Sequence, residues 1–151
     1  MEVDKDTITA KPFLRWAGGK TWLRKQIDKY LPLEGFNNYH EPFLGGGAIF
    51  FHLQPQCSYL SDLNEELITT YTEVKENVNS VIEYLGTYKN TPDFYYKIRK
   101  QNFRNNAEKA ARFIFLNQTS FNGIYRVNLK GEYNVPYGFR KKEFLDKENL
   151  I

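Results

Sequence analysis

The first regular pattern of apolar and polar residues in the chain predicts a helix that begins at a pair of glycines, Gly18 and Gly19. The apolar residues after this pair recur at intervals of three and four, which is the spacing of one helix face. Pro32 and Gly35 follow and supply a stop signal. The apolar face consists of Leu23, Ile27, Tyr30 and Leu31.

A strand, glycine loop, helix, strand and helix are predicted next. Residues 38–43 can form a short strand, which runs into the glycine-rich loop 44–48 and an apolar helical turn at 49–53. Residues 57–61 can form a second strand, with Asp62 at its C-terminal end. This order is typical of the start of an open parallel sheet. The helix after the second strand has an apolar face formed by Leu67, Tyr71, Val74 and Val78.

The second half of the chain is predicted to be helical and then to form a hairpin. The helical pattern continues to Gln118, with a break at 91–93 and its clearest helix at 107–116. Between residues 121 and 138, turn residues separate short extended runs, and Lys130–Gly131 is expected to form the turn of a β-hairpin.

Length and composition predict one intracellular, cytoplasmic domain. The chain has 151 residues and a single cysteine, Cys57, so a disulfide framework is excluded. The sequence shows no apolar N-terminal run and no long apolar span, so neither secretion nor a membrane location is expected. The acidic segment 2–6 is expected to be a frayed tail.

Charge is segregated along the chain. Residues 97–142 contain eleven Lys or Arg and two acids, Glu108 and Glu132, so the formal charge of this segment is +9. The remaining residues carry −6, which gives the total of +3. The basic segment also contains many aromatic residues, a combination that suits a polyanion such as a nucleic acid. A solvated basic face over an aromatic core would give the same composition.

Two glycine-bearing segments are candidates for a ligand site. Gly19–Thr21 resembles the end of a phosphate-binding loop, but Leu14 occupies the position of that loop's first glycine, so an NTPase is disfavoured. The glycines 45–47 follow the first strand, and Asp62 lies 21 residues after Glu41. Glycines allow close approach of the backbone to a ligand, and such an acid can hold a ribose. A tight turn with a helix-starting Asp would look the same. Because Phe50 replaces the third glycine of a dinucleotide motif, a nucleoside is favoured.

Four motifs together resemble Dam-type DNA adenine methyltransferases, the D12 class. They run in the family's order from about Pro12 to Lys142. The motifs are Phe13–Lys20 (FLRWAGGK), Glu41–Gly47 (EPFLGGG), Ser61–Asn64 (SDLN), and Phe121–Arg126 (FNGIYR) followed by Gly131–Gly138 (GEYNVPYG).

The resemblance implies S-adenosyl-L-methionine as the cofactor. It places Trp16, Ala17, Gly18 and Lys20 beside the methionine part of the cofactor, with Lys20 suited to the methionine carboxylate. It implies that Glu41, Phe43 and Gly45 line the loop under the cofactor. It also implies that Asp62 holds the ribose. The alternatives are a core tryptophan for Trp16 and a solvated lysine at a helix N-terminus for Lys20. No metal ligands are assigned.

The resemblance also implies double-stranded DNA as a partner and GATC as the target. Arg126 is expected to contact a base edge and Phe121 to wedge into the stack as the adenine leaves it, although a hairpin aromatic that packs on the preceding helix is the alternative. Phe121, Gln118 and Thr119 differ from the residues common in the family, which leaves the recognition sequence open. The remaining residues expected to shape the DNA contact are Asn122, Ile124, Asn128, Pro136 and Tyr137.

The catalytic tetrapeptide of the family, Asp-Pro-Pro-Tyr, is absent from the 151 residues. We therefore assign no catalytic residue and expect either a split enzyme, completed by a second chain that supplies this segment, or a truncated gene product or fragment. The alternative is a noncatalytic DNA-binding or regulatory module derived from such an enzyme.

The expected fold is α/β, an incomplete Rossmann-like methyltransferase sheet with a helical and β-hairpin DNA-recognition region. Residues 1–85 are predicted to form the cofactor-binding part, residues 86–142 the target-recognition region, and residues 143–151 the return to the catalytic domain.

Overall fold

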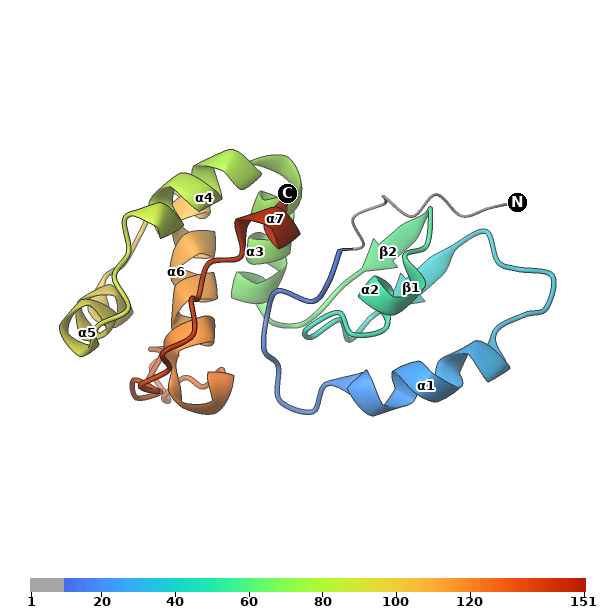
Figure 1. Ribbon diagram of the computed structural model, residues 1–151, viewed down its shortest axis with the longest axis horizontal. Helices are drawn as coiled ribbons and strands as arrows, with labels where there is room; N and C mark the ends of the chain where they lie inside the picture. Colours follow the sequence, from blue (N-terminus) through green and yellow to red (C-terminus); the bar gives the residue numbers. More distant parts are fainter. Residues whose placement is uncertain (1–9) are drawn as a thin grey trace.

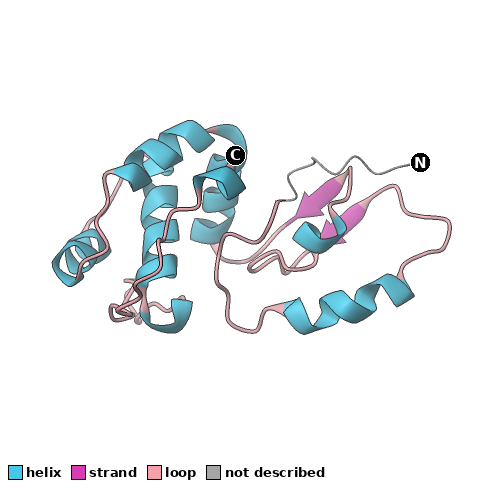
Figure 2. Ribbon diagram, in the orientation of Figure 1, coloured by secondary structure: helices cyan, strands magenta, loops and turns pink. Residues whose placement is uncertain are grey.

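The computed structural model describes residues 10–151, so the predicted acidic tail at 2–6 lies outside the described residues. A small sheet with its flanking helices occupies one side of the molecule, and a layer of helices occupies the other (Figure 1). The two strands lie next to each other among the helices (Figure 2). The chain is thus an α/β protein, as predicted.

The sheet of the described region has two parallel strands, β1 (Tyr39–Glu41) and β2 (Ser58–Leu60). The helix α2 (Phe50–Leu53) lies between them in the sequence. Tyr39 pairs with Ser58, and Glu41 with Leu60. The two predicted strands are confirmed, although both are shorter than expected. Parallel pairing brings the residues after both strands to the same edge of the sheet.

The helical segment after the glycine pair is confirmed but is only loosely packed. It consists of a 3₁₀ turn (Lys20–Leu23), α1 (Arg24–Ile27) and a second 3₁₀ turn (Asp28–Tyr30), and none of these three elements has a buried residue. Trp22 and Tyr30 are 69% and 75% exposed. The predicted apolar face therefore does not join the core of the described residues.

The helical layer is built around α6 (Asn106–Thr119), which carries nine buried residues. It packs against α3 (Glu65–Glu76) and α4 (Val78–Gly86), and α5 (Pro92–Lys100) lies against it as well. Figure 1 shows α6 at the centre of this layer, with the short α7 (Lys147–Leu150) near α3. One apolar cluster joins residues from α3 to α7, including Leu67, Val81 and Phe115.

Local sequence explains where these helices begin. The side chains of Asn64, Thr91 and Asn105 accept hydrogen bonds from backbone amides in the first turns of α3, α5 and α6. Capping of this kind satisfies amides that have no partner within the helix. The break predicted at 91–93 is therefore the start of α5, with Pro92 in its first turn.

The predicted hairpin follows α6 but forms only two isolated antiparallel bridges, Val127 with Tyr133 and Ser120 with Tyr137. Its turn lies where it was expected: the amide of Gly131 donates to Asn128 O at 2.9 Å, and Gly131 has a φ of 77°. Continuous strands are not formed because Pro136 has no amide to donate and the 3₁₀ turn Phe121–Gly123 interrupts the other arm.

Within residues 10–151, every helix is too short or too polar to cross a membrane.

Candidate cofactor pocket and nucleic-acid interface

A pocket of about 200 Å³ lies at the edge of the sheet where β1 and β2 end. Three segments form it: residues 16–20, which lead into the first helical turn; the end of β1 with the loop after it; and Asp62 after β2. All eight residues expected to bind the cofactor line this one pocket, although their binding roles remain predictions. They are Trp16, Ala17, Gly18, Lys20, Glu41, Phe43, Gly45 and Asp62.

Asp62 fixes the glycine loop. Its Oδ2 accepts from the amide of Gly45 at 2.9 Å, and its Oδ1 accepts from the amide of Asn64 at 3.0 Å. The opposite side of the loop is held by Tyr71, whose hydroxyl donates to Gly45 O at 3.1 Å. Burial, together with the charges of Glu41 and Asp62, raises the pKa of Tyr71, so this donor stays protonated. Each Asp62 oxygen can accept a further hydrogen bond, as a ribose contact requires.

Lys20 and Glu41 place opposite charges at the same end of the pocket. Lys20 Nζ donates to Phe43 O at 3.0 Å and lies 3.7 Å from Glu41 Oε1. Glu41 is buried, and its Oε2 accepts from the hydroxyl of Tyr39 at 2.8 Å. Burial and this carboxylate raise the pKa of Tyr39 above its ordinary value. A zwitterionic ligand would find a cation for its carboxylate and an anion for its ammonium here.

Trp16 forms the wall of the pocket that faces the helical layer. A Cβ added to Gly45 would lie 2.8 Å from Cδ1 of Trp16, so the loop and the indole are in direct contact. On its other side the indole stacks on Tyr125 and Phe113, with ring centroids 5.7 and 6.3 Å apart. Trp16 is therefore a half-buried, packed aromatic that also lines the pocket, and its contact with the cofactor stays a prediction.

The segment that carries Trp16 is tied to α6. The amide of Arg15 donates to Asn117 Oδ1 at 2.8 Å, and Asn117 Nδ2 donates to Arg15 O at 2.6 Å. Leu14, which replaces the first glycine of a phosphate-binding loop, is buried in the core. The local structure thus agrees with the sequence argument against an NTPase.

The hairpin presents some of the predicted DNA-binding residues and buries others. Phe121, Asn122, Arg126 and Pro136 are exposed, and Ile124 and Asn128 are half-buried. Asn122 adopts a left-handed conformation with a φ of 54°. Arg126 is held by Asn134, whose Oδ1 accepts from Arg126 Nε at 2.7 Å. Phe121 is 52% exposed, so about half of its surface is open to solvent.

Asn128 and Tyr137 serve the hairpin itself. Asn128 Oδ1 accepts from the amides of Lys130 and Glu132, which closes the turn. Tyr137 is 6% exposed, and its hydroxyl donates to Asn90. The structure does not place Tyr137 on the surface expected to face DNA, because its ring packs on Tyr95 in the core. Any contribution of Tyr137 to DNA binding would therefore be indirect, through its packing between the hairpin and the core.

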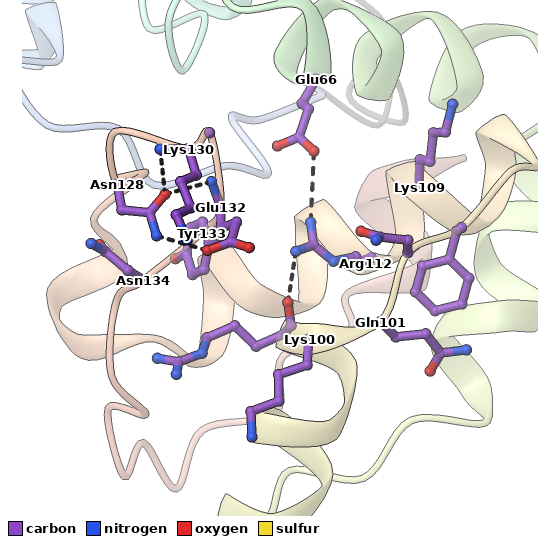
Figure 3. A pocket seen from close by; sticks show the side chains of 14 residues that line it. Glu66, Lys100, Gln101, Lys109, Arg112, Asn128, Lys130, Glu132, Tyr133 and Asn134 are labelled. Atoms are coloured by element: carbon purple, nitrogen blue, oxygen red, sulfur yellow. Dashed lines mark hydrogen bonds and ion pairs between the residues drawn. The ribbon is translucent and has the colours of Figure 1, made fainter.

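A second, larger cleft of about 800 Å³ lies between the hairpin turn, the end of α5 and α6. Figure 3 shows Arg112 between Glu66 and the end of α5, with the turn 128–132 on one side and Lys109 on the other. Its basic residues are Arg99, Lys100, Lys109, Arg112 and Lys130, against the acids Glu66 and Glu132.

Sequence reasoning missed Arg15 and Tyr125 as residues of this region. The guanidinium of Arg15 packs on Gly123, and its Nη1 is buried without a hydrogen-bond partner among residues 10–151. Burial and the nearby charge of Arg140 lower the pKa of Arg15. Arg15 lies next to Trp16 and Tyr125 next to Arg126, within two of the motifs that resemble the family. This adjacency was the signal in the sequence that could have identified them.

A sequence model of the D12 class N6 adenine-specific DNA methyltransferases matches residues 16–151. The chain belongs to this family. The matched residues include the hairpin and all eight residues of the pocket that were expected to bind the cofactor.

Three relatives are similar in sequence to nearly the whole of this D12-class chain. Type II methyltransferase M.MjaIII of Methanocaldococcus jannaschii is 41% identical over 166 residues, which cover 95% of this chain and 57% of that protein. Type II methyltransferase M1.LlaDCHI of Lactococcus lactis subsp. cremoris is 39% identical, over 97% of this chain and 54% of that protein. The DNA adenine methylase of Haemophilus influenzae is 38% identical, over 97% and 53%. The chain thus spans about half the length of these relatives.

Proposed function

We propose that this chain supplies the cofactor-binding and DNA-recognition part of an S-adenosylmethionine-dependent DNA adenine N6-methyltransferase. The observation that carries the proposal is the convergence of three separate sequence segments on one pocket, beside an exposed basic hairpin. Membership of the D12 family supports it.

The pocket suits S-adenosylmethionine. Lys20 is available for the carboxylate of the methionine part, Glu41 for its ammonium, and Asp62 for the ribose hydroxyls. Gly45 permits close approach, since a side chain there would meet Trp16. We also infer that the two parallel strands are the start of a Rossmann-like sheet, in which ligands bind at the carboxyl ends of the strands.

The hairpin and the adjoining cleft suit duplex DNA. Arg126 is exposed and oriented by Asn134, as a bidentate contact to a guanine edge requires. Phe121 is exposed at the start of the hairpin, where it can wedge between bases. The basic residues of the cleft can neutralise backbone phosphates on the same side as the turn. GATC is the target we propose.

Methyl transfer to adenine requires that the exocyclic amine attack the methyl carbon as the carbon–sulfur bond breaks, with loss of one amine proton. The family holds the amine with Asp-Pro-Pro-Tyr, which the 151 residues do not contain. We propose that polypeptide outside these residues, either in a longer form of this chain or in a second chain, supplies that segment.

Calorimetry with S-adenosylmethionine tests the cofactor assignment. Binding by the 151-residue chain, and its weakening in Asp62→Ala, would support the proposal. DNA binding with no heat from the cofactor would instead support a noncatalytic DNA-binding module, which the missing tetrapeptide also permits.

An assay of methyl transfer to a GATC duplex tests the need for further polypeptide. We expect no transfer by the isolated chain and restored transfer when a C-terminal half taken from a D12-class relative is added. Transfer by the pure chain alone would contradict the proposal.

A further inference from the structure

Tyr125 is the residue at which the cofactor pocket and the recognition hairpin meet. Its ring stacks on Trp16 with an interplanar angle of 23°, and Trp16 in turn touches the glycine loop at Gly45. Its backbone lies between Ile124 and Arg126, two of the residues expected to contact DNA. Gly45, Trp16 and Tyr125 therefore form a continuous path from the loop to the hairpin.

The hydroxyl of Tyr125 is held at the other end of the ring. It donates to Glu66 Oε2 at 2.9 Å, and Glu66 Oε1 lies 3.7 Å from Nη1 of Arg112. Arg112 also donates to the carbonyls of Ile98 and Arg99 at the end of α5, at 3.3 and 2.9 Å. The ring is thus fixed both by stacking and by a polar chain that leads into the basic cleft. Figure 3 shows the part of this chain that runs from Glu66 through Arg112 to the end of α5.

We propose that Tyr125 is a positioning residue that couples the cofactor pocket to the hairpin, so that cofactor binding and DNA binding strengthen each other. A ligand in the pocket confines Trp16 against Tyr125, which fixes the backbone that carries Arg126. Because coupling of two binding equilibria is reciprocal, DNA on the hairpin confines Trp16 in the same way. The inference rests on the proposed function, since it requires both ligands to bind.

The test measures the affinity for S-adenosylhomocysteine, a demethylated cofactor that cannot react, with and without a saturating GATC duplex. Trp22, which is exposed and does not line the pocket, is replaced by Phe, so that Trp16 is the only tryptophan and reports binding by its fluorescence. We expect the duplex to tighten binding by about fivefold or more, the lower end of typical coupling.

Three substitutions in this background isolate the role of Tyr125. Tyr125→Leu removes the ring and should reduce the coupling to nearly onefold, while each ligand alone still binds. Tyr125→Phe keeps the stack and should retain most of the coupling. Tyr30→Leu is the matched control, because Tyr30 is an exposed tyrosine of the N-terminal helical segment and lines neither the pocket nor the cleft.

The outcomes distinguish a failure of the proposed coupling from a failure of the proposed function. If both ligands bind but the duplex leaves the affinity unchanged, or if folded Tyr125→Leu keeps the full coupling, the inference is wrong and the proposed function stands. If neither ligand binds, both are wrong. Should Tyr125→Leu fail to fold, as judged by circular dichroism, the test uses the emission of Trp16 in the protein that keeps Tyr125. Addition of DNA without cofactor must change this emission, and an unchanged spectrum overturns the inference.

Discussion

The amide of Gly45 donates a 2.9 Å hydrogen bond to Oδ2 of Asp62, which joins the loop after β1 to the first residues after β2. The acid expected to hold a ribose thus also holds the loop on which the nucleoside would lie. Loop geometry and ligand affinity are therefore expected to change together when Asp62 is replaced.

Asp62→Ala should lower both stability and cofactor affinity. It removes a charged acceptor from the amides of Gly45 and Asn64, and hydrogen bonds to charged groups contribute about 1.5–3 kcal/mol. We expect a comparable loss in the free energy of unfolding, measured with urea. S-adenosylhomocysteine affinity, measured by calorimetry, should fall by about tenfold or more, since about 1.4 kcal/mol corresponds to tenfold.

Asp93→Ala is the control for removal of a carboxylate. Asp93 is exposed in the first turn of α5, where Thr91 provides the cap, and it does not line the pocket. Its loss should cost at most about 1 kcal/mol through the helix dipole and leave cofactor affinity unchanged. Equal effects of the two substitutions on affinity would count against a ligand-binding role for Asp62.

Gly45→Ala should destabilise the protein and obstruct the pocket. Gly45 has a φ of 52°, and the new Cβ would lie 2.8 Å from Cδ1 of Trp16. Left-handed strain costs about 1–2 kcal/mol and overpacking about 1–3 kcal/mol. We therefore expect a loss of about 2–5 kcal/mol in the free energy of unfolding and weaker binding of S-adenosylhomocysteine.

Gly86→Ala provides the matched comparison. Gly86 lies in α4, and an added Cβ would meet no atom within 4 Å. Gly86 is the last residue of this helix, and replacement of glycine by alanine where the backbone is compatible stabilises by about 0.4–1 kcal/mol, so this variant should gain stability in the same urea experiment. A stable Gly45→Ala variant with intact affinity would show that the loop does not need a glycine at this position.

Ionisation of Tyr125 should contribute to alkaline destabilisation. Burial and the charge of Glu66 raise the pKa of Tyr125 to about 12 in the folded protein, above the unfolded value near 10. The folded state therefore retains a proton that the unfolded state has lost, and this contribution to stability is complete below pH 10 and is lost as the pH rises toward 12. Urea unfolding between pH 8 and 12 should show the loss.

Tyr125→Phe should make the free energy of unfolding less dependent on pH in that interval, and Tyr30→Phe, which removes the hydroxyl of an exposed tyrosine, is the matched control. Tyr88, whose pKa burial also raises to about 12, is unchanged in both variants and contributes equally to each curve. Identical curves for Tyr125→Phe and the unmodified chain would mean that the hydroxyl of Tyr125 is not held in the folded state.

The sequence was sufficient for most elements but not for the environment of single side chains. The helix at 106–119 and the turn at Lys130–Gly131 could be predicted because periodicity and turn residues are local signals. The burial of Tyr137 could not, because it depends on how the hairpin packs on α5 and α6. The exposure of Tyr30 on the predicted apolar face was equally hidden, since an amphipathic pattern does not say whether a partner surface is present.

The pocket could be predicted in outline from motifs that lie far apart in the sequence. Their convergence was an expectation from the order of strand, loop and acid, and the pocket lining agrees with it. The contact between Trp16 and Tyr125 joins segments more than a hundred residues apart. No local pattern encodes such a contact, and for that reason the link between pocket and hairpin emerged only from the structure.

Arg126 and Lys100 should affect DNA binding in different ways. Arg126 is exposed on the hairpin, where a guanidinium can contact a base edge, and each such contact contributes about 1–3 kcal/mol of discrimination. Arg126→Ala should therefore reduce the preference for a GATC duplex over one with an altered first base pair. Lys100 lines the basic cleft, so Lys100→Gln should weaken the binding of both duplexes equally. Loss of one phosphate contact should also reduce the slope of log K against log salt concentration by about one.

Fluorescence anisotropy with both duplexes at several salt concentrations separates these effects. Lys29→Gln is the charge control, because Lys29 lies in the N-terminal helical segment and lines neither the cleft nor the pocket. It should leave the preference and the salt slope unchanged. If Arg126→Ala instead weakened both duplexes equally, the side chain would be a phosphate contact, and discrimination would have to reside elsewhere on the hairpin.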